Sequence, residues 1–211
     1  MRFIFKTDYE QDIRLFKHGG HVFWYGLLGV LLLAAPWWAS EYVMSQLQFI
    51  CIYSIVGFGL MMLTGFTGQI SLGHAAFLAV GAYTEALMQA AGVPFFISIT
   101  CAALFSAAVG IIVGLPALRL KGIYLAIATL AFNVIVEEII TRWHSLTGGN
   151  EGKHLKPVEI LGWKLESDAE FYYLCLALTV LCCLFCINLL RSPTGRAFVA
   201  IRDSEISASC M

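Results

Sequence analysis

Long stretches without charged residues are the feature that most constrains how this chain folds. No Asp, Glu, Lys or Arg lies between Glu41 and Glu85, between Glu85 and Arg119, or between Glu170 and Arg191. A helix that crosses the roughly 30 Å of hydrocarbon in a bilayer needs about 20 apolar residues, because each residue adds 1.5 Å. Backbone in lipid must also satisfy its own hydrogen bonds, so we expect these stretches to be helices.

Six stretches have the length and composition of a membrane-spanning helix. They are the ranges 22–40, 45–64, 69–91, 94–115, 123–141 and 171–190. Charged residues make up only 13% of the chain and hydrophobic residues 59%, whereas about a quarter of a soluble domain is charged. This composition excludes a disordered chain, a nucleic-acid-binding domain and an ordinary cytosolic enzyme. The sequence therefore predicts an all-α, polytopic transmembrane helical bundle in a lipid bilayer.

The positions of the basic residues predict how the bundle is oriented. Nine of the 13 Lys and Arg residues precede the first span, separate the fourth from the fifth, or follow the sixth: Arg2, Lys6, Arg14, Lys17, Arg119, Lys121, Arg191, Arg196 and Arg202. Short cytoplasmic loops carry an excess of Lys and Arg, so we expect these segments and the N-terminus in the cytoplasm. The predicted organisation is a cytoplasmic segment at 1–21, a transmembrane domain at 22–190 with an external loop at 142–170, and the start of a cytoplasmic segment at 191–211.

The first span also permits a cleaved signal peptide, because small residues occur at Ala34, Ala35 and Ala39. An uncleaved helix is favoured, since the 21 residues before it mix acidic with basic side chains. Trp37 and Trp38 at its far end also resemble the aromatic anchors found at a membrane interface.

The residues that could support catalysis or metal binding do not form a recognisable motif. None of the five histidines belongs to an H-x-x-x-H or H-E-x-x-H pair, and six of the seven cysteines lie inside apolar spans. Residues 68–73 read G-x-x-S-x-G, one residue longer than a nucleophile elbow. Residues 149–154 lack the first glycine and the Ser/Thr of a phosphate loop. We therefore expect no enzyme activity, no metal and no cofactor, and active transport would need ATP hydrolysis on another subunit.

Polar and small residues within the spans are candidates for a translocation path or its gating, because polar groups at membrane depth need partners or water. The candidates are Gln69, Ser71, Gly73, His74, Glu85 and Asn133. Simple packing or interfacial solvation is the alternative for each of them. Gly110 and Gly114 form a GxxxG pattern, which lets two helix backbones approach closely.

Four segments carry more specific strings. They are LTGFTGQISLGHAAF at 63–77 with GAYT at 81–84, GLPALRLKGIYLAIATLAF at 114–132, LTGGN at 146–150, and SPTGRAF with AIRDSEI between 192 and 206. In this order they resemble the M-type permease subunit of branched-chain amino acid ABC importers. The resemblance runs from about residue 55 to the last residue.

The resemblance implies a subunit of the bacterial inner membrane that forms part of a translocation path. It implies as partners a companion permease subunit, two ATP-binding cassette ATPase subunits and a periplasmic substrate-binding protein, and no nucleic acid. It also implies a cytoplasmic ATPase-coupling segment that contains Gly195, Arg196, Phe198, Ile201, Arg202, Asp203 and Glu205. A short helix with Phe198 and Ile201 on one face suits docking into a groove on an ATPase. The alternative is an amphipathic helix that lies on the membrane surface.

The chain departs from the family pattern in two places. Lys153, His154 and Lys156 follow a turn after which family members commonly carry an apolar residue, and the chain ends at Met211 inside the coupling segment. We therefore expect 1–211 to be the N-terminal part of a permease, without transport activity of its own.

Three alternative functions remain at this point. One is an ABC importer permease for urea, amides or related small solutes. Another is a passive channel or facilitator for a small polar solute, which needs no docking helix. The third is a membrane enzyme that uses His74, Glu85 or Glu137, against which the missing catalytic spacings argue.

Overall fold

Helices form nearly all of the part of the chain that the structure describes. The computed structural model describes residues 19–117, 119–120, 122–153, 155, 158–160, 163–164 and 167–203. The long helices are α2 (Gly19–Trp38), α3 (Glu41–Leu60), α4 (His74–Ala90), α5 (Phe95–Ala117), α6 (Ile123–Arg142) and α8 (Asp168–Arg191), and the shorter α9 (Pro193–Asp203) follows α8. A π-helical segment, η1 (Met61–Phe66), continues α3 without a break.

Short elements connect α6 to α8. They are α7 (His144–Thr147), the 3-10 turn η2 (Gly149–Glu151), and the two-residue strands β1 (Glu159–Ile160) and β2 (Trp163–Lys164). The strands pair antiparallel, with Glu159 opposite Lys164. The predicted external loop therefore has local structure of its own.

Four helical segments are long and apolar enough to cross a membrane. They are Glu41–Phe66, Phe95–Ala117, Ile123–Arg142 and Asp168–Arg191. The prediction of an all-α polytopic chain is confirmed at this level, because the only strands described are the two-residue pair in one connection. The first and third predicted spans are a shorter apolar stretch, Phe23–Trp38, and a helix of 17 residues, α4.

The third predicted span is wrong at its first residues. A helix was expected from residue 69, but 67–73 is not helical and α4 begins at His74. Gly68 has a φ of 70°, a left-handed conformation that interrupts a right-handed helix. The same segment contains Thr67, Gly68, Ser71 and Gly73. Thr, Ser and Gly all favour helix less than the aliphatic residues around them.

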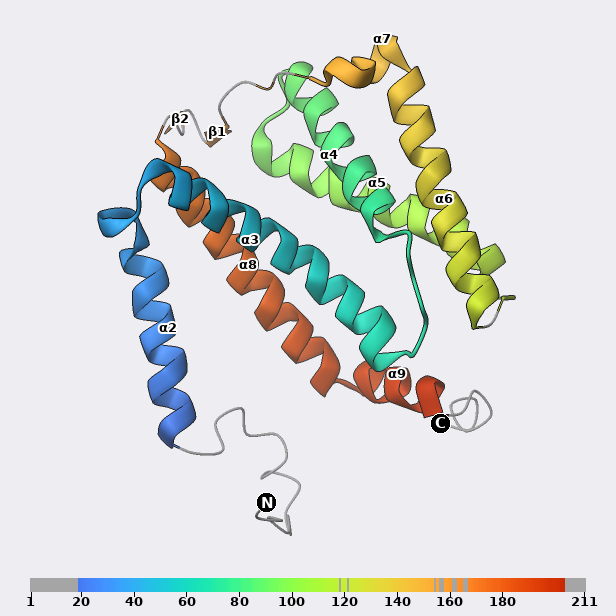
Figure 1. Ribbon diagram of the computed structural model, residues 1–211, viewed down its shortest axis with the longest axis horizontal. Helices are drawn as coiled ribbons and strands as arrows, with labels where there is room; N and C mark the ends of the chain where they lie inside the picture. The colour runs from blue at the N-terminus through green and yellow to red at the C-terminus, as the bar shows by residue number, and fades with distance from the viewer. Residues whose placement is uncertain are drawn as a thin grey trace.

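Successive helices run in alternate directions, so the connections fall at two opposite ends of the molecule (Figure 1). One end carries the loop 67–73, the turn after α5 and helix α9. The other carries the α2–α3 turn, α7 and the β1–β2 pair. Arg119 and the basic residues of α9 lie at the first end, and Arg142 lies at the second.

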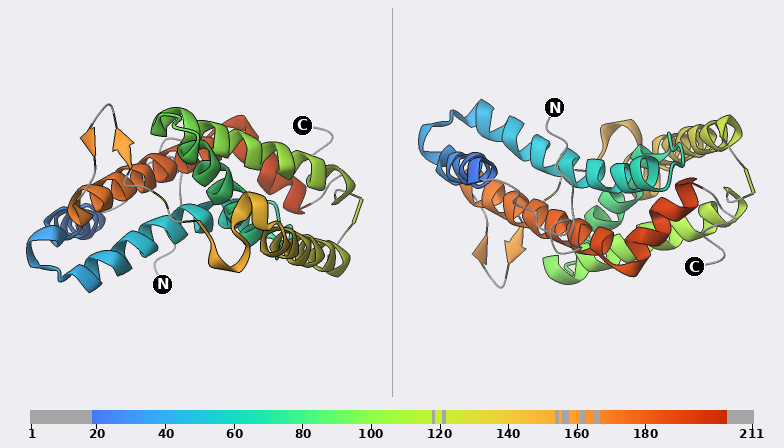
Figure 2. Two further views of the ribbon diagram at one scale, coloured as in Figure 1. Left: turned by 90° about the horizontal axis from the view of Figure 1, so that it is seen from above. Right: turned by 90° about the horizontal axis from the view of Figure 1, so that it is seen from below.

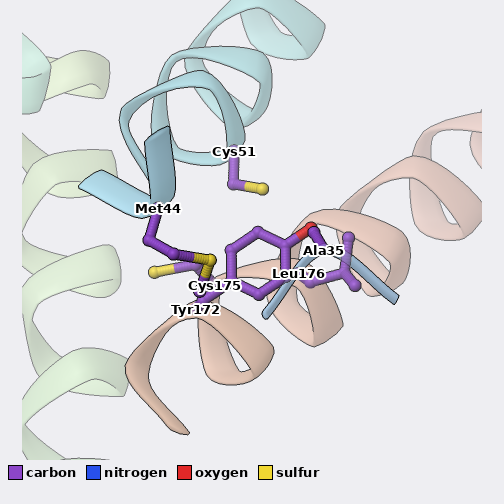
Figure 3. Close-up of a cluster of buried hydrophobic side chains, with 6 residues drawn as sticks. All are labelled: Ala35, Met44, Cys51, Tyr172, Cys175 and Leu176. Atoms are coloured by element: carbon purple, nitrogen blue, oxygen red, sulfur yellow. The ribbon is translucent and has the colours of Figure 1, made fainter. Parts of the chain in front are cut away.

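Helix α3 packs along α8, and α4 packs against α5 and α6 (Figures 1 and 2). Helix α2 joins the first pair through a cluster of buried side chains from three helices, shown in Figure 3: Ala35, Met44, Cys51, Tyr172, Cys175 and Leu176. Elsewhere most large apolar side chains remain exposed, as expected for surfaces that face lipid or partner subunits.

A tyrosine of α8 repairs a break in the hydrogen bonding of α2, and the next tyrosine adds a second contact between the two helices. Pro36 lies inside α2 and has no N–H, so the carbonyl of Leu32, four residues earlier, loses its helical partner. The hydroxyl of Tyr172, which is fully buried, donates to the Leu32 oxygen at 2.9 Å. The hydroxyl of Tyr173 donates to the Leu33 oxygen, also at 2.9 Å. Neighbouring helices are the expected donors for backbone groups that a proline frees within a membrane.

This arrangement predicts a dependence of Tyr172 on Pro36. Tyr172→Phe should destabilise the protein by about 1 kcal/mol, because it leaves a buried carbonyl without a donor. In a Pro36→Ala background residue 36 regains an N–H for the Leu32 carbonyl, so the same substitution should cost well under half as much. A double-mutant cycle on thermal unfolding in detergent measures the coupling.

Tyr42→Phe is the matched control, since Tyr42 is 74% exposed and loses the same hydroxyl. It should leave the unfolding temperature unchanged. If Tyr172→Phe lowers the stability equally with and without Pro36, Tyr172 does not replace the hydrogen bond that Pro36 removes from α2.

Candidate functional site

A cavity of about 610 Å³ opens at the end of the molecule that carries α9. This volume lies within the range of ligand clefts, roughly 300–1,000 Å³. Its walls come from the loop after η1, the last turns of α5, the start of α6 and α9. Most lining residues are apolar or glycine, and the polar lining side chains are Thr67, Gln69, Ser71, Thr129 and Arg202.

The non-helical loop 67–73 forms one wall of this cavity. Its backbone is tied at both ends: the N–H of Gln69 donates to the Leu63 oxygen at 3.1 Å, and the N–H of Leu72 donates to Thr129 Oγ1 at 3.0 Å. Thr129 Oγ1 in turn donates to the Ala126 oxygen at 2.9 Å. Irregular backbone in a membrane protein is tolerated where it lines a cavity, as this loop does.

Two of the six path candidates, Gln69 and Ser71, line the cavity, whereas the other four do not. Ser71 is only 8% exposed, and Gln69 is half-buried. Gly73 is buried beside α6, where an added Cβ would lie 2.8 Å from the Thr129 carbonyl oxygen. Gly73 therefore permits the close approach of the start of α4 to α6.

His74 packs between α3 and α4 outside the cavity lining. Its Nε2 atom lies 3.1 Å from the point that a Cβ on Gly59 would occupy, and its ring meets Phe77 edge-on at a centroid distance of 6.3 Å. Its Nδ1 atom is buried with no hydrogen-bond partner among the described residues. Asn133 is half-buried on α6, also outside the cavity lining.

Glu85 joins α4 to α5 away from the cavity. Ser98, which is fully buried, places its Oγ 2.7 Å from Glu85 Oε1 and 2.9 Å from the Phe95 oxygen, and its single hydroxyl hydrogen serves these two acceptors. The second carboxyl oxygen of Glu85 is buried without a hydrogen-bond partner among the described residues. No group of three or more His, Cys, Asp or Glu side chains within the described ranges is placed to hold a metal ion.

The two glycines of the GxxxG pattern have different surroundings. Gly110 borders the cavity and lies beside Phe77 of α4, whose Cε1 would be at an ordinary contact distance of 3.7 Å from an added Cβ, so the packing of α4 on α5 does not require glycine here. Ser106 supports the same contact, since its hydroxyl donates to the Phe77 oxygen at 3.0 Å. Gly114 has no atom within 4 Å of an added Cβ and borders the cavity.

The described part of the predicted coupling segment forms helix α9, directly after α8. Gly195 is buried at the corner between the two helices, where an added Cβ would overlap the backbone of Leu190. Arg196 is exposed, Phe198 is half-buried, and Ile201 borders the cavity while remaining 37% exposed. Glu205 lies outside the described residues.

Arg202 and Asp203 end the helix with an ion pair, in which Nε lies 3.3 Å from Oδ1. A second nitrogen of Arg202, Nη1, donates to the Gly65 oxygen in η1 at 3.2 Å. The structure therefore shows the Arg202 side chain turned toward the loop that borders the cavity.

Thr129 is the residue that sequence reasoning missed. Its hydroxyl oxygen accepts a hydrogen bond from the Leu72 N–H of the loop, and its carbonyl oxygen leaves no room for a side chain at Gly73. It lies within the string 114–132 that carries part of the resemblance. A lone threonine within an apolar span was the available signal, since such a residue needs an acceptor or donor nearby.

Comparisons with known proteins agree on one family. Residues 42–211 match a family described as branched-chain amino acid transport system / permease component. The chain is 36% identical over 203 residues to the high-affinity branched-chain amino acid transport system permease protein LivM of Escherichia coli (strain K12), a match that covers 84% of this chain and 48% of that protein. It is 36% identical over 208 residues to LivM of Salmonella typhimurium (strain LT2), with 86% and 49% covered.

The chain thus spans about half the length of the curated relatives that it matches. No solved structure is significantly similar to it.

The close approach at Gly73 gives a test of the cavity wall. Gly73→Ala should lower the free energy of unfolding by about 1–3 kcal/mol, because the added methyl group meets the backbone oxygen of Thr129. Gly81→Ala, within the helix that follows, is the matched control, since an added Cβ there has no atom within 4 Å. Thermal unfolding of the purified protein in detergent measures both, and equal stability of the two variants would contradict the close packing of α4 on α6.

Proposed function

Because the chain belongs to the family of permease components of branched-chain amino acid transport systems, we propose that it is a membrane-spanning permease subunit of an ABC importer for branched-chain amino acids. Its role is to form part of the translocation path and to couple that path to separate ATPase subunits, rather than to catalyse a reaction. The observation that carries the proposal is the family match over 42–211, together with 36% identity to the LivM permeases.

The proposed topology has six spans in this chain and a cytoplasmic N-terminus, in the inner membrane of a bacterium. Four segments qualify as spans by length and composition, and α2 with 20 residues supports a fifth. For the sixth, α4 extends about 26 Å at 1.5 Å per residue, and the loop 67–73 adds the remaining depth. The basic residues at the α9 end support its assignment to the cytoplasm.

Within this topology we keep the organisation proposed from the sequence. Residues 1–21 form a cytoplasmic segment, 22–190 the transmembrane domain with its external loop at 142–170, and 191–211 the start of a cytoplasmic coupling segment. The sharp corner at Gly195, where α9 turns away from α8, supports the last boundary.

The proposed partners are a companion permease subunit, two ATP-binding cassette ATPase subunits and a periplasmic substrate-binding protein. Exposed apolar faces support a companion within the membrane, for example the side of α5 that carries Leu104, Phe105, Ile111 and Leu115. Helix α9 has a polar exposed side and an apolar side, as expected of a helix that docks into a groove on a soluble subunit.

The proposed cargo is a branched-chain amino acid, on the strength of the family description and of the relatives' names. The cavity agrees with such a solute, since apolar walls surround a few polar side chains. Urea and amides are the competing cargo, and a passive facilitator is the competing mechanism.

Uptake into reconstituted vesicles that have the periplasmic face outside and ATP in the lumen tests the transport class. The permease that contains this chain, assembled with its companion permease, ATPases and binding protein, should accumulate labelled leucine, isoleucine or valine only when ATP is supplied. Unlabelled branched-chain amino acids should compete, whereas urea and acetamide should not. Uptake without ATP would favour a facilitator, and competition by urea alone would overturn the cargo.

The docking of α9 has a separate test at Ala197, which is exposed on that helix. Ala197→Trp should reduce co-purification of the ATPase subunits by about tenfold or more, since a bulky side chain obstructs a close-fitting interface. Ala197→Ser keeps the size and should leave co-purification unchanged. Normal ATPase binding by both variants would place the exposed side of α9 outside the interface.

A further inference from the structure

Arg202 reaches from α9 to the segment that precedes the cavity loop. Its Nη1 donates to the Gly65 oxygen at 3.2 Å, and its side-chain stem lies against Gly68. A Cβ added to Gly68 would be 2.8 Å from Arg202 Cγ, so the absence of a side chain at residue 68 lets the stem lie directly on the loop backbone. The contact therefore involves both the hydrogen bond and the stem.

The Gly65 carbonyl is a suitable acceptor because it lies in the last turn of η1, which ends at Phe66. Carbonyls in the last turn of a helix lack intrahelical donors and carry partial negative charge. A guanidinium that donates to such a carbonyl makes a charge-assisted hydrogen bond, which is stronger than a neutral one. Arg202 thus caps the C-terminal end of the α3–η1 helix from a different helix.

The far end of the loop is attached elsewhere. Leu72 donates its N–H to Thr129 Oγ1 of α6 at 3.0 Å, and Gly73 is packed against the same threonine. Between these two attachments lie Gln69 and Ser71, which line the cavity. The loop is therefore a bridge from α9 to α6 that carries polar groups of the cavity wall.

We propose that Arg202 is a positioning residue that joins α9 to the end of η1 and the loop 67–73, so that these segments move as one unit and a displacement of α9 reaches the cavity wall directly. This inference rests on the proposed function, in which α9 is the helix that the ATPases move. It assigns Arg202 to a contact within the permease rather than to the ATPase surface. The exposed ion pair with Asp203 joins neighbours within α9, whereas the Gly65 and Gly68 contacts are the ones that reach a different segment.

A disulfide between residues 68 and 202, in place of the Arg202 contacts, tests whether the loop and α9 move together. An added Cβ on Gly68 would lie 3.6 Å from Arg202 Cβ, within the range of about 3.5–4.5 Å for disulfides. In the assembled transporter the Gly68→Cys/Arg202→Cys protein should be poorly coupled when reduced. After mild oxidation uptake should return to the level of the Gly68→Cys single variant, and reductant should abolish it again.

The single-cysteine variants control for cross-links to the native cysteines and for the effect of a side chain at the left-handed residue 68. An oxidised double variant that stays inactive, while Gly68→Cys alone transports, would show that the loop and α9 separate during transport and would overturn the proposal. Failure of the pair to cross-link would overturn it as well, since the two Cβ positions would then not be adjacent.

A second measurement needs no cysteine at residue 68. Arg202→Ala should raise the ratio of ATP hydrolysed to solute taken up by about 5-fold or more, the range of typical coupling energies. Arg202→Lys, which keeps a charged donor, should recover part of the coupling, and the ATPases should still co-purify with both variants. Arg119→Ala, which removes an exposed guanidinium in the turn after α5, is the matched control and should leave the ratio unchanged.

Loss of ATPase co-purification in Arg202→Ala would instead place Arg202 at the ATPase interface and would overturn the inference while leaving the proposed function intact. An unchanged ratio in Arg202→Ala would also overturn it. Absence of ATP-driven uptake by the unmodified complex would reject the proposed function, and the inference with it.

Discussion

The hydrogen bonds of the backbone are the constraint on which the rest of this structure depends. Within a bilayer a carbonyl or N–H has no water to bond, and an unpaired group costs several kcal/mol. The carbonyl freed by Pro36, the last-turn carbonyl of Gly65 and the N–H of Leu72 each find a side chain on another helix. Tyr172, Arg202 and Thr129 supply these partners; the first two hydrogen bonds join two helices, and the third joins the loop to α6. Interrupted helices therefore become the points at which the bundle is held together.

These junctions organise the molecule around the cavity. Helices α3 and α8 form one packed unit with α2, and α4, α5 and α6 form another. The segment from Met61 to Gly73 leads from the first unit to the second, and α9 contacts it from below in the view of Figure 1. The cavity lies where this segment, α5, α6 and α9 meet. In the proposed function this is where we expect the permease to change shape, because packed helices on either side resist deformation.

Particular residues show how far sequence reasoning reached. The long apolar helices follow from hydropathy alone, and the family follows from strings whose order the comparison over 42–211 confirms. The expected helix from residue 69 was wrong, because hydropathy does not register the left-handed Gly68 or the poor helix formers around it. Gln69 and Ser71 lie at the cavity as the path hypothesis requires, whereas His74, Glu85 and Asn133 lie away from its lining. Their roles in transport remain part of the proposal.

The amino-acid sequence by itself determined that the chain is helical, apolar and multi-pass, because hydropathy and backbone satisfaction are properties of consecutive residues. It also located the family strings, including the one at 192–206 that is proposed to couple to the ATPases. Only the tertiary structure decided that Tyr172 bonds the carbonyl freed by Pro36 and that Arg202 turns inward to Gly65, across separations of 140 and 137 residues. Such partners are chosen by which helices pack side by side, and no local pattern around a proline or an arginine specifies which distant group will meet it.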